Sequence, residues 1–164
     1  MKHDSQSEQL TESDRSDASR RPGSRTRRIM VVDDDPAARV LAKRIFTEAG
    51  FEVSTGQSGF ECLEKFRKAP NSFDLIVLDL SMPFMDGEET FRHLRAIKPN
   101  VVVLLSTGFL TQAQDRIDRM LAAGMAGFIR KPHRPDELLA QVYATLQRVK
   151  ISRVGAASDL KASV

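Results

Sequence analysis

The chain has 164 residues, 41% of them apolar, which suits one domain with tails better than two domains. Its net charge of +3 arises at the ends. Residues 1–28 hold 7 Lys and Arg against 5 Asp and Glu, and residues 151–164 hold 2 against 1, so the part between them holds 16 of each sign. This neutral part argues against a nucleic-acid surface on the folded domain.

The composition also bears on location. No apolar stretch approaches the ~20 residues of a membrane span, and the first residues lack the hydrophobic region of a signal peptide. The one cysteine, Cys62, cannot form an internal disulfide and is expected in the core. We therefore expect a cytoplasmic protein.

The N-terminal segment 1–28 is rich in Ser, Asp, Glu and Arg, and Leu10 is its one large aliphatic residue after Met1. Such a segment buries too little apolar surface to offset its ordering entropy, so a disordered charged arm is expected. We predict a domain over 29–150 and a short tail over 151–164.

Short apolar runs follow the arm, at residues 29–32, 51–53, 75–78, 101–105 and 126–129. Three of them are almost continuous in Val, Ile and Leu, as in parallel strands buried on both faces. Each run precedes a stretch with helical spacing. The spacing is marked by Leu41 and Ile45, by Phe60, Leu63 and Phe66, by Phe91 and Leu94, by Ile117 and Met120, and from about 135 to 149 by Leu138, Val142 and Leu146. The pattern predicts an α/β fold: a doubly wound (βα)₅ unit with a five-stranded parallel sheet.

Polar residues stand where several of these strands end. Asp33 and Asp34 follow the first strand, Asp79 the third, Thr107 the fourth and Lys131 the fifth. The carboxyl ends of parallel strands lie at one edge of the sheet, so we expect these groups to converge in one crevice.

Carboxylates brought together repel one another unless a cation joins them, and oxygen ligands without His or Cys favour a hard ion such as Mg²⁺. Mg²⁺ usually keeps coordination positions for waters and a phosphate oxygen, which suits phosphoryl chemistry. Lys131 would supply a positive charge for a phosphoryl group, and Thr107 a hydroxyl donor. Helix capping is the simpler interpretation of Asp35 and Asp86, but capping does not account for a lysine at a strand end.

Four motifs resemble those of response-regulator receiver domains. They are Val31-Val32-Asp33-Asp34-Asp35-Pro36, Leu75 to Gly87 around Asp79, Leu104-Leu105-Ser106-Thr107-Gly108, and Gly127-Phe128-Ile129-Arg130-Lys131-Pro132. Their order and approximate spacing are those of the family, from Ile29 to about Lys150. The resemblance implies the flavodoxin-like receiver fold.

The resemblance also implies a role for each matching residue. Asp79 matches the aspartate that accepts the phosphoryl group, and Asp33 and Asp34 match the acidic pair that holds Mg²⁺ with Asp79. The backbone carbonyl of Ser81 would complete the metal shell. Lys131 matches the lysine that contacts the phosphoryl group, in a Lys-Pro bond that is often cis. Thr107 and Phe128 match the switch pair.

Partners follow from the same resemblance. A sensor histidine kinase or phosphotransfer protein would donate to Asp79. Phosphorylation would then switch a surface formed by the fourth helix, fifth strand and fifth helix, which would bind a protein target or a second copy of the chain. The protein would be a signalling domain and not an enzyme. It would catalyse its own phosphorylation and slowly remove the phosphoryl group again.

Some residues depart from the family pattern or lie outside it. Phe128 stands where many members of the family have Tyr, and the bulky, apolar Phe109 is expected to shield the phosphoryl group and lengthen its life. His93 and His133 are interpreted as ordinary surface or edge residues, and Arg130 as a surface residue.

Three alternatives stay open at this stage. The first is a receiver from a longer hybrid histidine kinase that acts in a phosphorelay. The second is a receiver-like module that never accepts phosphate. The remote third is a phosphatase of the haloacid-dehalogenase type with Asp33 as nucleophile.

Overall fold

A computed structural model describes residues 25–108 and 110–161 of the chain. Most of the predicted arm and Phe109 therefore lie outside the described residues. The elements, in chain order, are β1 (Arg28–Val32), α1 (Pro36–Glu48), β2 (Glu52–Gly56), α2 (Gly59–Lys68), β3 (Leu75–Asp79), α3 (Gly87–Ile97), β4 (Val103–Thr107), α4 (Leu110–Ala122), β5 (Gly127–Arg130) and α5 (Pro135–Lys161).

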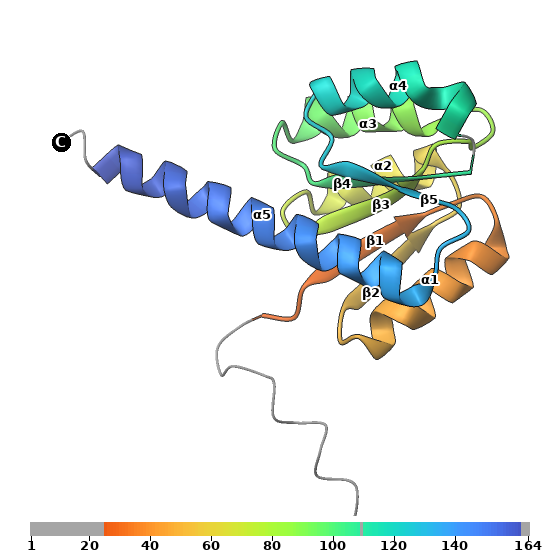
Figure 1. Ribbon diagram of the computed structural model, residues 1–164, viewed down its shortest axis with the longest axis horizontal. Coiled ribbons are helices and arrows are strands. Elements are labelled where there is room, and N and C mark those ends of the chain that lie inside the picture. Colours follow the sequence, from red (N-terminus) through yellow and green to blue (C-terminus); the bar gives the residue numbers. More distant parts are fainter. Residues whose placement is uncertain (1–24, 109, 162–164) are drawn as a thin grey trace, which may run out of the picture.

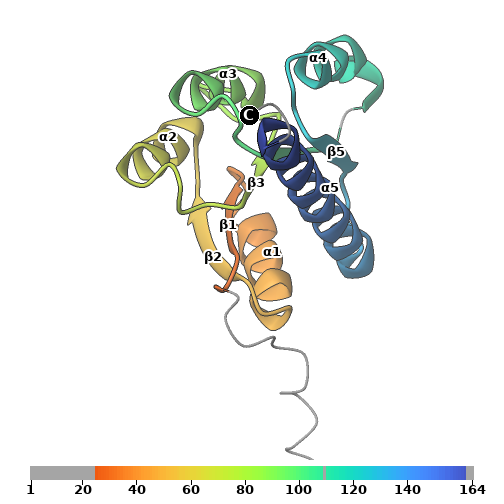
Figure 2. The ribbon, with the colours of Figure 1, turned by 90° about the vertical axis from the view of Figure 1, so that its left-hand side faces the viewer.

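The five strands form one parallel sheet in the order β2-β1-β3-β4-β5. Helices α1 and α5 cover one face, and α2, α3 and α4 cover the other (Figures 1 and 2). The predicted doubly wound α/β fold is thus confirmed. From β1 the chain adds β2 on one side and then β3, β4 and β5 on the other, so the direction in which strands are added reverses between β1 and β3. In such sheets, binding sites form at the carboxyl ends of the strands beside this reversal.

Two apolar cores lie on the two faces of the sheet. Strand side chains alternate between them: Met30 and Ile76 pack with α2, α3 and α4, and Ile29 and Val77 pack with α1 and α5. Every residue of β3 is buried, which explains its unbroken Val, Ile and Leu run. Cys62 is fully buried in the first core, as expected, and burial raises its pKa to about 12.

Two aspartates set where helices begin. The carboxylate of Asp35 accepts a hydrogen bond from the Ala37 amide at the start of α1, and that of Asp86 accepts one from the Glu89 amide at the start of α3. Both therefore satisfy amides that the first turn of a helix leaves unpaired, as the capping interpretation predicts.

Some expected boundaries and side-chain positions differ from the structure. β4 ends at Thr107, as expected, but begins at Val103, two residues after the start of the apolar run 101–105. α5 continues to Lys161, through most of the segment expected to be a tail. Phe60 was expected on the buried face of α2, but 57% of it is exposed, whereas Leu63 and Phe66 are buried. Within the described residues, no helix is long and apolar enough to cross a membrane.

Candidate functional site

The strand register brings the polar strand ends together, as the sequence predicts. Asp79, the last residue of β3, is aligned with Ser106 on β4, and Thr107 is aligned with Arg130 on β5. Lys131 follows β5 directly, and its amide donates to the Thr107 carbonyl at 2.8 Å. Because adjacent strands hold these positions, the side chains share one edge of the sheet.

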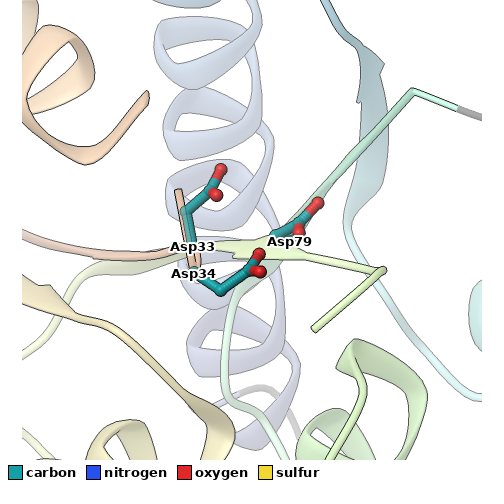
Figure 3. A group of neighbouring side chains, drawn as sticks. All are labelled: Asp33, Asp34 and Asp79. Carbon is teal, nitrogen blue, oxygen red and sulfur yellow. The ribbon is translucent and has the colours of Figure 1, made fainter. Parts of the chain in front are cut away.

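Three aspartates form an acidic cluster at this edge. Carboxylate oxygens of Asp33, Asp34 and Asp79 all lie within 4.8 Å of one another (Figure 3). Asp33 and Asp79 are 5% and 4% exposed, whereas Asp34 is open to solvent. Oxygen ligands at this spacing can hold a hard cation, and the exposed side leaves room for further ligands. The arrangement fits the predicted Mg²⁺ site.

The ammonium group of Lys131 contacts the two buried aspartates of the cluster. Its Nζ donates to Asp33 Oδ2 at 2.6 Å and to Asp79 Oδ1 at 3.0 Å. The Lys131-Pro132 bond is cis, as the family resemblance implied. Lys131 therefore offsets part of the charge of the two buried carboxylates.

Burial and charge shift the pKa values of Asp79 and Lys131. Burial raises the pKa of Asp79, and the neighbouring Asp33 and Asp34 raise it further, although the hydrogen bond and charge of Lys131 partly oppose this. Burial lowers the pKa of Lys131, but its hydrogen bonds and charge interactions with Asp33 and Asp79 outweigh burial and raise it overall. Asp79 is thus a more basic carboxylate than usual, beside a lysine that stays charged.

The remaining predicted site residues lie around the cluster. Thr107 is fully buried at the end of β4, and Ser81 is exposed two residues beyond Asp79. Phe128, in β5, is 36% exposed, and its neighbour Ile129 is buried under α5. Arg130 is exposed, as interpreted from the sequence.

Gly87 brings α3 close to the end of β3, a contact that no sequence pattern predicted. A Cβ atom at this position would lie 2.4 Å from the Asp79 carbonyl oxygen and 2.8 Å from the Leu80 Cα. The Gly87 amide also donates to the Leu80 carbonyl at 2.9 Å. The absence of a side chain at Gly87 therefore lets the loop after Asp79 turn tightly into α3.

Two further contacts were also missed. His133 was interpreted as a surface or edge residue, but it is half-buried, and its Nε2 lies 2.8 Å from the Ser106 hydroxyl. Its Nδ1 lies 2.9 Å from the Arg130 carbonyl oxygen, so the ring links β4 to the turn that carries Lys131. The second contact is made by Arg39 of α1, whose Nη1 donates to the carbonyl oxygens of both Asp33 and Asp34. No local sequence signal marks either pairing.

A parallel sheet doubly wound with five helices, with acidic and basic groups at the strand ends, defines a flavodoxin-like receiver fold. The sequence profile of the response regulator receiver domain matches residues 29–143. The chain therefore belongs to the response regulator receiver family of two-component signalling.

Individual relatives agree with this assignment. The response regulator MprA of Mycobacterium ulcerans (strain Agy99) is 35% identical over 136 residues, covering 81% of this chain and 56% of that protein. MprA of Mycobacterium sp. (strain KMS) is 37% identical over 124 residues, covering 74% and 51%. The chain thus spans about half the length of the curated relatives it matches.

Solved structures show the same fold. A receiver domain from Clostridium thermocellum superposes with a TM-score of 0.71 at 27% identity, covering 76% of this chain and 98% of that one. The chemotaxis protein CheY4 of Vibrio cholerae gives 0.67 at 28% identity, covering 74% and 99%. A chain of the CheX-CheY-BeF3-Mg²⁺ complex from Borrelia burgdorferi gives 0.67 at 25% identity, covering 72% and 87%.

Proposed function

We propose that Asp79 accepts a phosphoryl group, in a Mg²⁺-dependent reaction, from a histidine kinase or a phosphotransfer protein. One observation carries the proposal: a buried carboxylate of raised pKa lies 3.0 Å from the Lys131 ammonium and within 4.8 Å of two other aspartates. Membership of the receiver family supports the same chemistry.

Asp33, Asp34 and Asp79 would hold the metal ion, together with the backbone carbonyl of Ser81. When bound, Mg²⁺ would supply positive charge that offsets the three carboxylates and the transferring phosphoryl group. A similar structure, the CheX-CheY complex from Borrelia burgdorferi, contains Mg²⁺ and BeF3, an analogue of a phosphoryl group, which supports the proposal.

In the proposed reaction, an Asp79 carboxylate oxygen attacks the phosphorus atom of a phosphohistidine on the partner. A P–O bond forms and the P–N bond breaks, so the partner's histidine leaves with the bonding electron pair. Lys131, already beside the Asp79 carboxylate, would donate to an oxygen of the arriving phosphoryl group. Its charge is useful there because negative charge spreads over the transferring oxygens.

The switch would begin at Thr107. Its hydroxyl would reorient towards the phosphoryl group, and Phe128 would then move towards the space that Thr107 leaves. A surface of α4, β5 and α5 would change its shape and bind a protein target or a second copy of the chain. A free-standing receiver and a receiver within a longer hybrid kinase would both use this chemistry.

No contact among the described residues favours the phosphatase alternative. Asp33 would be its nucleophile, but the two Asp33 carboxylate oxygens accept hydrogen bonds from the Asp35 amide and from Lys131. Asp79 lacks such a backbone contact among the described residues and is the better nucleophile.

A small phosphodonor tests the proposal. The full chain is incubated with acetyl phosphate with and without Mg²⁺, and intact mass is measured. We expect one added phosphoryl group with Mg²⁺, none in Asp79→Asn, and slower addition in Asp33→Asn. Labelling that survives in Asp79→Asn but is lost in Asp33→Asn would instead support the phosphatase, and no labelling of the unmodified chain would support a module that never accepts phosphate.

A further inference from the structure

Arg39, the fourth residue of α1, reaches back to the acidic cluster. One nitrogen of its guanidinium, Nη1, donates to the carbonyl oxygen of Asp33 at 2.7 Å and to that of Asp34 at 3.0 Å. A single charged donor thus holds two successive peptide groups of the turn between β1 and α1. Hydrogen bonds from charged donors are stronger than those from neutral donors, so this contact can hold the turn in one conformation.

The three aspartates differ in how they are held. The Asp33 carboxylate accepts from the Asp35 amide and from Lys131, and the Asp79 carboxylate accepts from Lys131. Within the described residues, Asp34 has a single hydrogen bond, which is the one its carbonyl accepts from Arg39. The position of its exposed carboxylate therefore depends on the position of its backbone.

We propose that Arg39 is a positioning residue for metal binding, because its hydrogen bonds to the Asp33 and Asp34 carbonyls hold the Asp34 carboxylate where it can bind Mg²⁺. This inference rests on the proposed function of the acidic cluster. Groups that orient metal ligands without touching the metal typically contribute about 10- to 100-fold to metal affinity.

A long-range charge effect would act in the opposite direction. Arg39 is a cation near a cation site, so its charge alone repels Mg²⁺, and its removal should strengthen Mg²⁺ binding. The charge of Arg39 is also felt at Glu61 of α2. The pKa of Glu61 is lowered chiefly by its hydrogen bond with Lys65, with a smaller contribution from the charge of Arg39. Positioning and charge repulsion thus predict changes of opposite sign.

Mg²⁺ binding to the full chain distinguishes positioning by Arg39 from charge repulsion by Arg39. Calorimetry, together with amide NMR shifts of Asp34 and Asp79, gives the Kd of the unmodified chain and of Arg39→Met. We expect the Kd to rise roughly tenfold or more in Arg39→Met. Arg39→Lys should restore much of the affinity, because an ammonium group can also donate to two carbonyls. Arg44→Met is the matched control: it removes the same charge from α1, where Arg44 pairs with the exposed Glu48, and should leave the Kd almost unchanged.

A double-mutant cycle then tests whether Arg39 acts through Asp34. In an Asp34→Asn background, Arg39→Met should weaken Mg²⁺ binding much less than in the unmodified chain, because the ligand that it positions is gone. An equal or lower Kd in Arg39→Met, or effects of the two substitutions that simply add, would overturn the inference. If the unmodified chain binds no Mg²⁺, the proposed function itself fails; if it binds Mg²⁺ but Arg39→Met binds equally well, only this inference fails.

Discussion

The ammonium group of Lys131 lies 3.0 Å from the carboxylate of Asp79, across the edge of the sheet where β3 and β5 end. The two residues are 52 positions apart in the chain. Their contact places a positive charge beside the proposed phosphoryl acceptor, so removal of this charge should slow the phosphorylation of Asp79.

Replacing Lys131 by Met removes this charge and keeps most of the apolar stem. We expect Asp79 phosphorylation by acetyl phosphate at saturating Mg²⁺ to slow by roughly 100-fold or more, the usual effect of losing a donor that stabilises transition-state charge. Time-resolved intact mass measures the rate. Lys68→Met is the control, because Lys68 pairs with Glu64 on the exposed side of α2; equal rates for the two variants would contradict the role.

The raised pKa of Asp79 predicts a pH-dependent stability in the absence of metal. The folded state binds this proton more tightly than the unfolded state does, so the favourable contribution is present at acidic pH and is lost as pH rises through the raised pKa. Asp79→Asn should therefore stabilise the metal-free protein at neutral pH and give little gain at acidic pH. Urea unfolding in the presence of EDTA at a series of pH values measures this difference; a gain that grows towards acidic pH would contradict it.

Phe84 stands in a left-handed backbone conformation, with a φ of 65° and 96% of the residue exposed. A side chain in this region typically costs ~1–2 kcal/mol, and Phe84 has almost no packing to lose. We expect Phe84→Gly to raise the free energy of unfolding by about 0.5–1 kcal/mol, after the greater chain entropy of glycine is subtracted. Phe84→Ala, which keeps the Cβ atom, should give no such gain in the same urea titration.

Glycine 87 should tolerate no side chain. Because a Cβ atom would lie 2.4 Å from the Asp79 carbonyl oxygen, Gly87→Ala must displace backbone. A loss of about 1–3 kcal/mol in unfolding free energy is expected, as for other overpacked sites, together with slower phosphorylation because Asp79 moves. Gly108→Ala is the matched control, since a Cβ atom there would meet no atom of the described residues within 4 Å. Equal stabilities of the two variants would show that the loop after β3 adapts at little cost.

Several features of the fold could be predicted because they depend on neighbours in the chain. Buried parallel strands need continuous apolar runs, so β1 and β3 were predicted to within one residue. Asp35 and Asp86 were interpreted correctly as caps, because a cap bonds amides only two or three residues away.

Element ends were harder to predict where local preference and tertiary structure differ. Val101 and Val102 are as apolar as a strand, but they are buried before β4 begins. β4 instead begins at Val103 and ends with Ser106 and Thr107, where the fourth strand was expected to end. Register with β3 and β5 holds these two residues in the sheet.

The sequence by itself determined the alternation of strands and helices and the order of the acidic, hydroxyl and basic residues along the chain, because these follow from local periodicity and from which residue ends each strand. Only the tertiary structure decided which groups meet. Arg39 clamps the turn that carries Asp34, His133 meets Ser106, and Gly87 packs against the backbone of Asp79. The latter two contacts join separate elements, and the Arg39 clamp depends on how α1 is oriented against the turn before it. All three therefore depend on how the sheet and its helices pack, which no local pattern of residues specifies.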